Sequence, residues 1–73
     1  MAFFLIVVSK GNSGRDYAAA YGRSKSEEGY MTEAGARRAA ATFKIAKSVV
    51  VAQFADLRAA RLYAAEVTEL INV

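Results

Sequence analysis

The first apolar segment of the chain carries no polar interruption. Residues 3–8 read FFLIVV, a run of aromatic and β-branched side chains. An unbroken run of this length and composition is typical of a strand that is apolar on both faces. Successive side chains of a strand point to opposite sides, so the odd-numbered and even-numbered residues form two separate apolar sets. The pattern therefore predicts a strand over 3–8 that needs cover on both sides.

Two glycines, Gly11 and Gly14, follow this strand between Lys10 and Arg15. Glycines beside cations raise the possibility of a phosphate-binding loop. A Walker-type loop, however, needs a G-x-x-x-x-G-K-[ST] spacing and a helix directly after it. Gly, Asn and Ser are common turn formers that tolerate positive φ. We therefore predict a hairpin loop rather than a phosphate site.

A second strand is predicted over 16–23. In the segment DYAAAY, a set with both tyrosines alternates with alanines, as expected for a strand whose two faces differ: Tyr17, Ala19 and Tyr21 alternate with Ala18 and Ala20. Its high alanine content leaves a single helical turn as the alternative.

A helix is predicted over 33–46. Thr32 is a good N-cap, because its side-chain oxygen can accept a hydrogen bond from a free backbone N–H of the first turn. Glu33 complements the positive end of the helix dipole. At 3.6 residues per turn, apolar side chains fall on one face of this helix, and arginines and lysines fall on the opposite face. That apolar face consists of Ala36, Ala39, Ala40, Phe43 and Ala46.

The last two elements predicted are a strand over 48–54 and a helix over 57–71. The β-branched run in SVVVAQF favours a strand. Asp56 can cap the following helix, in which seven apolar residues between Leu57 and Ile71 share one arc. A strand in place of this helix would need a turn within ADLRAA, which contains no Gly, Asn or Pro.

These elements predict a single α+β domain over 1–73 with the order β-β-α-β-α. We expect a three-stranded sheet with both alanine-rich helices on one of its faces. One apolar set of the first strand would then stay exposed, and exposed apolar patches usually mark interfaces. The simplest solution is a two-fold homodimer, or a higher oligomer, in which a second copy of the sheet or a shared strand edge covers the surplus set, Phe4, Ile6 and Val8.

The composition supports self-association and argues against catalysis. A chain of 73 residues builds only a small core, and sixteen of its residues are alanine. The sequence contains no Cys and no His, which removes disulfides, thiolate or imidazole metal ligands and the commonest catalytic side chains. We expect no enzyme, no metal and no cofactor. The sequence shows no signal-peptide pattern and no membrane span, so a cytoplasmic protein without membrane contacts is predicted.

The net charge of +3 is a mild positive bias. It allows a small basic nucleic-acid-binding protein, in which cations follow the phosphates and tyrosines stack on bases. No helix-turn-helix, RNP-like or zinc-knuckle pattern supports sequence reading. The candidate contacts for this alternative are Lys10, Arg15, Arg23, Lys25, Lys44 and Lys47, with Arg37 and Arg38.

The leading prediction is a non-enzymatic protein-binding module. Small α+β proteins without Cys or His are typical of phages and mobile elements, and many of these inhibit or modulate a larger host protein or nucleoprotein machine. This expectation depends on size and composition and on no motif. Arginine and tyrosine are frequent hot-spot residues, because each offers a large contact area or several donors. The predicted partner contacts are Arg37, Arg38, Arg58, Arg61, Tyr17 and Tyr21.

Overall fold

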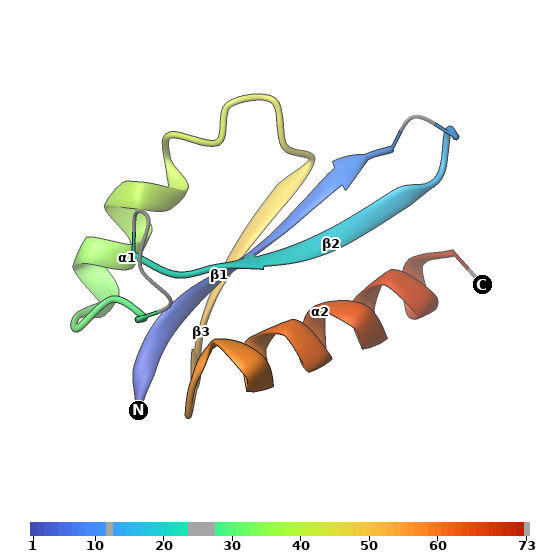
Figure 1. Cartoon of the computed structure of the whole chain (residues 1–73). Helices are drawn as coiled ribbons and strands as arrows, with labels where there is room; N and C mark the ends of the chain where they lie inside the picture. The colour runs from blue at the N-terminus through green and yellow to red at the C-terminus, as the bar shows by residue number, and fades with distance from the viewer. Residues whose placement is uncertain (12, 24–27, 73) are drawn as a thin grey trace.

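A three-stranded antiparallel sheet and two helices make up the fold (Figure 1). The computed structural model describes residues 1–11, 13–23 and 28–72. The strand order is β2-β1-β3, so the first strand of the sequence lies at the centre of the sheet. The predicted α+β order β-β-α-β-α is confirmed. The elements are β1 (Ala2–Lys10), β2 (Asp16–Tyr21), α1 (Glu33–Ala40), β3 (Ser48–Phe54) and α2 (Leu57–Ile71).

The hairpin between β1 and β2 answers the question raised by the two glycines. The Gly11 N–H donates to the Arg15 carbonyl at 2.7 Å, and the Gly14 N–H donates to the Gly11 carbonyl at 3.1 Å. Gly14 has φ +84°, a left-handed conformation that glycine adopts without a steric penalty. A strand follows the loop, where a Walker-type loop requires a helix. The hairpin is confirmed, and Asn12 lies outside the described residues.

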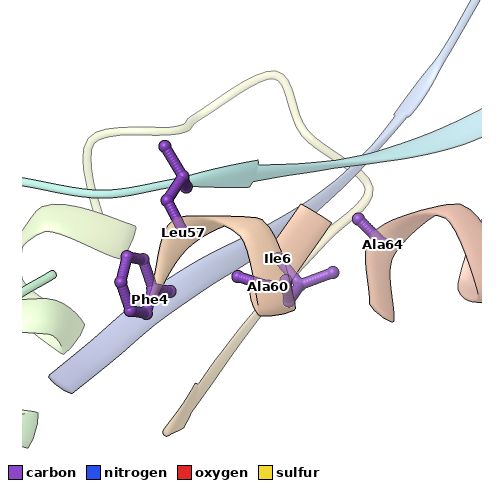
Figure 2. Close-up of a cluster of buried hydrophobic side chains, with 5 residues drawn as sticks. All are labelled: Phe4, Ile6, Leu57, Ala60 and Ala64. Carbon is purple, nitrogen blue, oxygen red and sulfur yellow. The ribbon is translucent and has the colours of Figure 1, made fainter. Parts of the chain in front are cut away.

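The two helices lie on opposite faces of the sheet, and the prediction that both share one face is wrong. Phe4 and Ile6 on β1 pack in one buried cluster with α2. Figure 2 shows these two side chains beside those of Leu57, Ala60 and Ala64. The even-numbered set of β1 is therefore covered within a single chain.

The odd-numbered set of β1 is covered by α1. Leu5 and Val7 form the second buried cluster with Ala36, whose side chain is fully enclosed. The predicted apolar face of the first helix contributes the surrounding contacts, because Ala39, Ala40, Phe43 and Ala46 all pack against this cluster. The sheet is thus the middle layer of a three-layer α/β/α sandwich.

This arrangement removes the reason for a homodimer through the first strand. Phe4 and Ile6 are each only 1% exposed in the single chain. No surplus apolar face of β1 is left for a second copy to cover. The predicted dimer surface on Phe4, Ile6 and Val8 is therefore wrong, since a fully apolar strand in this fold is satisfied by one helix on each side.

Both predicted N-caps are confirmed. The Thr32 hydroxyl accepts from the Gly35 N–H at 3.1 Å, and an Asp56 carboxylate oxygen accepts from the Ala59 N–H at 2.9 Å. These bonds satisfy backbone donors that the first helical turn leaves without intrahelical partners.

The first helix ends six residues earlier than predicted, at Ala40 instead of residue 46. The Thr42 hydroxyl donates to the Ala39 carbonyl at 2.7 Å, and the Thr42 and Phe43 N–H groups bond three residues back rather than four. Such tightening is common where an α-helix stops. The chain then turns toward β3, and the Phe43 ring lies 5.3 Å from that of Tyr21.

A short bridge extends the sheet beyond β2, which ends at Tyr21 rather than at residue 23 as predicted. Tyr30 and Phe3 exchange two backbone hydrogen bonds of 2.7 and 2.9 Å. Gly29 is buried beside this bridge, where a methyl group would meet the Phe3 carbonyl at 2.8 Å. The close approach of two backbones explains why a glycine occupies this position.

Candidate functional site

The six predicted partner contacts do not form one surface. Tyr17 and Tyr21 project from the α1 face of β2, each 44% exposed, because they pair with odd-numbered residues of β1. Arg58 and Arg61 are exposed on α2, in the layer on the other side of the sheet. The tyrosines and these arginines lie on different faces of the sheet. A partner of ordinary size would therefore contact one pair and not the other.

The arginines of α1 are exposed on the same side of the sheet as the tyrosines. Arg37 Nε donates to Glu33 Oε2 at 2.8 Å, an i,i+4 pair on the solvent side of the helix. Arg38 is exposed as well. Exposed pairs of this kind contribute only a few tenths of a kcal/mol.

Some of the basic residues predicted to contact nucleic acid form ion pairs with carboxylates, and others are exposed. Lys10 and Arg15 are exposed on the hairpin, and Lys44 is exposed on the connection before β3, which approaches the same end of β1 because the Lys47 N–H donates to the Val8 carbonyl at 2.8 Å. Lys47 Nζ reaches Asp16 Oδ2 at 2.9 Å. Arg23 pairs with Glu28 at 3.0 Å, and Lys25 lies outside the described residues.

An exposed apolar surface on α2 was not predicted. Leu62 is 63% exposed and Leu70 is 73% exposed, and both stand away from the sheet. Tyr63 and Ile71 are also more than 40% exposed at the margin of the helix. We call this set, Leu62, Tyr63, Leu70 and Ile71, the α2 surface. The apolar arc of this helix was predicted to pack on the sheet, yet only Leu57, Ala60 and Ala64 in its first half are buried.

The reason for the partial burial is the position of α2 over the edge of the sheet. The Ala18 N–H at the outer side of β2 donates to Thr68 Oγ1 at 2.9 Å, and the Asn72 side chain donates to the Asp16 carbonyl at 2.8 Å. The first half of α2 therefore packs over the central strand β1, and its second half passes along the outer edge of β2. Side chains on its far flanks have no strand beneath them.

A shallow hollow of about 530 Å³ lies between β2 and α2. Alanines line most of it, with Thr68 between them and the charged groups of Arg61 and Glu69 at its margin. Small side chains explain the hollow, since a helix and a strand that meet through alanines leave unfilled space at their borders. It offers few polar groups that could fix a ligand.

Thr68 allows a direct test of how α2 protects this edge. Thr68→Val keeps the side-chain shape but leaves the Ala18 N–H without its acceptor, and we expect a loss of about 1–3 kcal/mol in unfolding free energy. Thr68→Ser retains the hydroxyl and should lose much less. Urea unfolding followed by circular dichroism measures both variants. Equal stability of the two would show that the hydroxyl contact is unimportant.

The described residues contain no group of three or more Asp and Glu side chains placed to hold a metal ion. Within the same ranges, no polar or charged side chain is buried. None of the helices in the described part of the chain is long and apolar enough to cross a membrane.

Comparisons with protein-family models, with curated proteins and with solved structures found no match to this chain.

Proposed function

We propose that this chain is a non-enzymatic protein-binding module that contacts its partner through the α2 surface. The observation that supports this proposal is the exposure of Leu62 and Leu70, two large aliphatic side chains on one helix. Transferring each of them from water into an interface is worth roughly 1.5–3 kcal/mol. Amphipathic helices of this kind commonly bind in an apolar groove.

Charged residues on the same helix define the chemistry of the partner. Arg58 and Arg61, two of the predicted contacts, are exposed on α2 and can donate to carboxylates. Glu66 and Glu69 are exposed on the same helix, and Glu66 lies between Leu62 and Leu70. The partner surface we infer is an apolar groove with acidic groups opposite Arg58 and Arg61 and a basic group opposite Glu66. A small phage or mobile-element inhibitor of a larger host protein or nucleoprotein machine would use such a surface, and this finer proposal depends on size and composition.

The test compares two sets of exposed residues. We expect the double variant Leu62→Gln/Leu70→Gln to bind its partner at least tenfold more weakly, because both side chains lose their apolar contact. Ile45→Gln is the matched control, since Ile45 is fully exposed in the connection before β3 and lies outside the α2 surface. Immobilised native and variant chains are exposed to an extract of the source cells, and captured proteins are quantified by mass spectrometry. The proposal predicts one stoichiometric partner, retained by Ile45→Gln and lost by the double variant. Retention by both would contradict it, as would the absence of any stoichiometric partner.

The second candidate is a small basic nucleic-acid-binding protein. The observation in its favour is that Lys10, Arg15 and Lys44 are exposed on segments that approach the same end of β1. Ion pairs of Arg23, Arg37 and Lys47 with carboxylates weaken it, because those pairs would have to open to contact phosphates.

Retention of single- and double-stranded DNA and RNA at low salt separates the two functions. A nucleic-acid function predicts an affinity that falls steeply with salt and that drops in Lys10→Gln/Arg15→Gln. A protein-binding function predicts no such retention and no dependence of partner capture on these two cations.

A further inference from the structure

The outer edge of β3 is an open strand edge, unlike that of β2. Alternate residues of an antiparallel strand direct their N–H and C=O groups to the same side. The backbone groups of Phe3 bond to Tyr30 on the β2 side. The N–H and C=O groups of the odd-numbered residues of β1 are therefore directed toward β2, and those of the even-numbered residues toward β3. Ile6 lies opposite Val50 and Phe4 opposite Ala52, so the backbone groups of Val50 and Ala52 are directed toward β1. The backbone groups of the alternate residues of β3 are therefore directed outward, away from the sheet.

The outward-facing residues of β3 are Val49, Val51 and Gln53. Across residues 1–11, 13–23 and 28–72, none of their backbone groups has a hydrogen-bond partner from another segment. The corresponding edge of β2 is protected, since Thr68 and Asn72 of the C-terminal segment bond to Ala18 and Asp16. Among the described residues, side chains of α2 and its C-cap therefore protect the β2 edge of the sheet and leave the β3 edge open.

The sequence of β3 lacks the features that usually prevent edge-to-edge pairing. Natural edge strands carry lysines, prolines or bulges, or are very short. The segment SVVVAQF has seven residues, no charge and no proline. Val50 on the α2 face of this strand is 48% exposed, although valine is among the residues most often buried.

We propose that β3 pairs in antiparallel fashion with β3 of a second copy of this chain. A two-fold axis at Val51 places Val51 opposite the same residue of the second copy, and Val49 opposite Gln53. The pairing uses the three outward-facing residues of each strand and joins the two sheets into one of six strands. It also sets each Val50 beside an Ala52, which reduces the exposure of Val50.

The charges at the two ends of β3 favour this antiparallel direction. Lys44 precedes the strand and Asp56 follows it, while the Lys47 ammonium is already paired with Asp16 of β2. Antiparallel pairing brings the end of one strand that follows Lys44 beside the end of the other that precedes Asp56, whereas parallel pairing would bring the two Lys44 residues together. No charged residue lies between these ends, so two copies meet along β3 without like-charge repulsion.

This homodimer uses a surface different from the α2 surface and does not depend on the proposed function. It also differs from the dimer predicted through β1, whose apolar faces are covered in one chain. Loss of partner capture and loss of the dimer should therefore occur in different variants.

A single introduced cysteine tests the register, because the natural chain contains none. Val51→Cys places two thiols across the two-fold axis, with Cα atoms at the separation of about 5.5 Å that suits both an antiparallel pair and a disulfide. Under mild oxidation we expect most of this variant to become a covalent dimer. Ile45→Cys, at a fully exposed position in the connection before β3, is the collision control, because the proposed register does not pair it with its counterpart, and it should remain mainly monomeric.

A second pair of variants keeps the test valid if Val51→Cys folds poorly. Gln53→Pro removes one outward N–H without removing a bond to β1, and Gln53→Thr retains that N–H. Light scattering should give twice the 7.9 kDa chain mass for the native chain and for Gln53→Thr, and the single-chain mass for Gln53→Pro. A native chain that stays monomeric at several hundred micromolar would overturn the proposal and leave the edge for a strand of another protein. A dimer that persists in Gln53→Pro, or equal cross-linking of the two cysteine variants, would also overturn it.

Discussion

Replacing either Phe4 or Leu5 by alanine is expected to destabilise the domain severely. The two residues are neighbours on β1, and each is 1% exposed, but they belong to different buried clusters. Removing a buried Phe or Leu side chain costs about 2–5 kcal/mol through lost transfer free energy and the cavity left behind. A domain of this size has a total stability of only about 3–5 kcal/mol, so a large unfolded fraction is expected for both variants.

Leu62→Ala is the matched control, because Leu62 is an exposed leucine and should cost less than about 0.5 kcal/mol. Urea unfolding followed by circular dichroism measures all three variants. If Phe4→Ala or Leu5→Ala proved as mild as Leu62→Ala, the corresponding face of β1 would not be covered by a helix.

Gly29→Ala is expected to produce the second-largest loss of stability. An alanine methyl group at this position would lie 2.6 Å from the Ala2 Cβ atom and 2.8 Å from both the Phe3 carbonyl oxygen and the Phe4 ring. Two of these neighbours are main-chain or Cβ atoms that cannot rotate away. Overpacking of this kind costs about 1–3 kcal/mol.

Gly35→Ala is the control for this substitution. Its methyl group would meet only the Thr32 hydroxyl, at 3.1 Å, and alanine gains up to about 1 kcal/mol of helix propensity over glycine. We expect Gly35→Ala to stay within about 1 kcal/mol of the native stability. A Gly29→Ala variant as stable as Gly35→Ala would show that Tyr30 does not pair with Phe3 as described.

The elements could be predicted from the sequence because their signals are local. The caps at Thr32 and Asp56, the β-branched run of β3 and the glycine at position 14 each act within a few residues. The end of α1 could not be predicted in the same way. Phe43 and Ala46 continue the apolar period and still pack against the second buried cluster, although the chain has left the helix at Ala40.

The placement of the helices depends on contacts far apart in the sequence. The unbroken apolar run of β1 already indicated cover on both faces, and one helix on each face satisfies it without a second chain. The alanine-rich faces of the helices do not indicate which face of the sheet each helix covers, because Ala36 and Ala60 can pack on either side of a sheet with equal ease. The bridge between Tyr30 and Phe3 likewise has no local signal except the glycine before it.

The wrong placement of the helices also led to a wrong prediction of which apolar surface is exposed. With β1 covered inside one chain, the exposed large aliphatic side chains on the described helices and strands are those of α2 and Val50 of β3. Arg58 and Arg61 stay close to one of these surfaces, whereas Tyr17 and Tyr21 lie on the opposite face of the sheet. The predicted contacts on α2 are therefore retained in the proposed function, and those on β2 remain predictions for a separate surface.

Nuclear Overhauser contacts between methyl groups test the three-layer arrangement most directly. Isotope-filtered spectra of mixed labelled and unlabelled chains identify the contacts between chains, so that these can be set apart from the contacts within one chain. The structure predicts contacts from Ile6 to Ala60 and Ala64, and contacts from Val7 to Ala36. Contacts of Ala36 and Ala60 with the same side chain of β1 would place both helices on one face and would contradict the account.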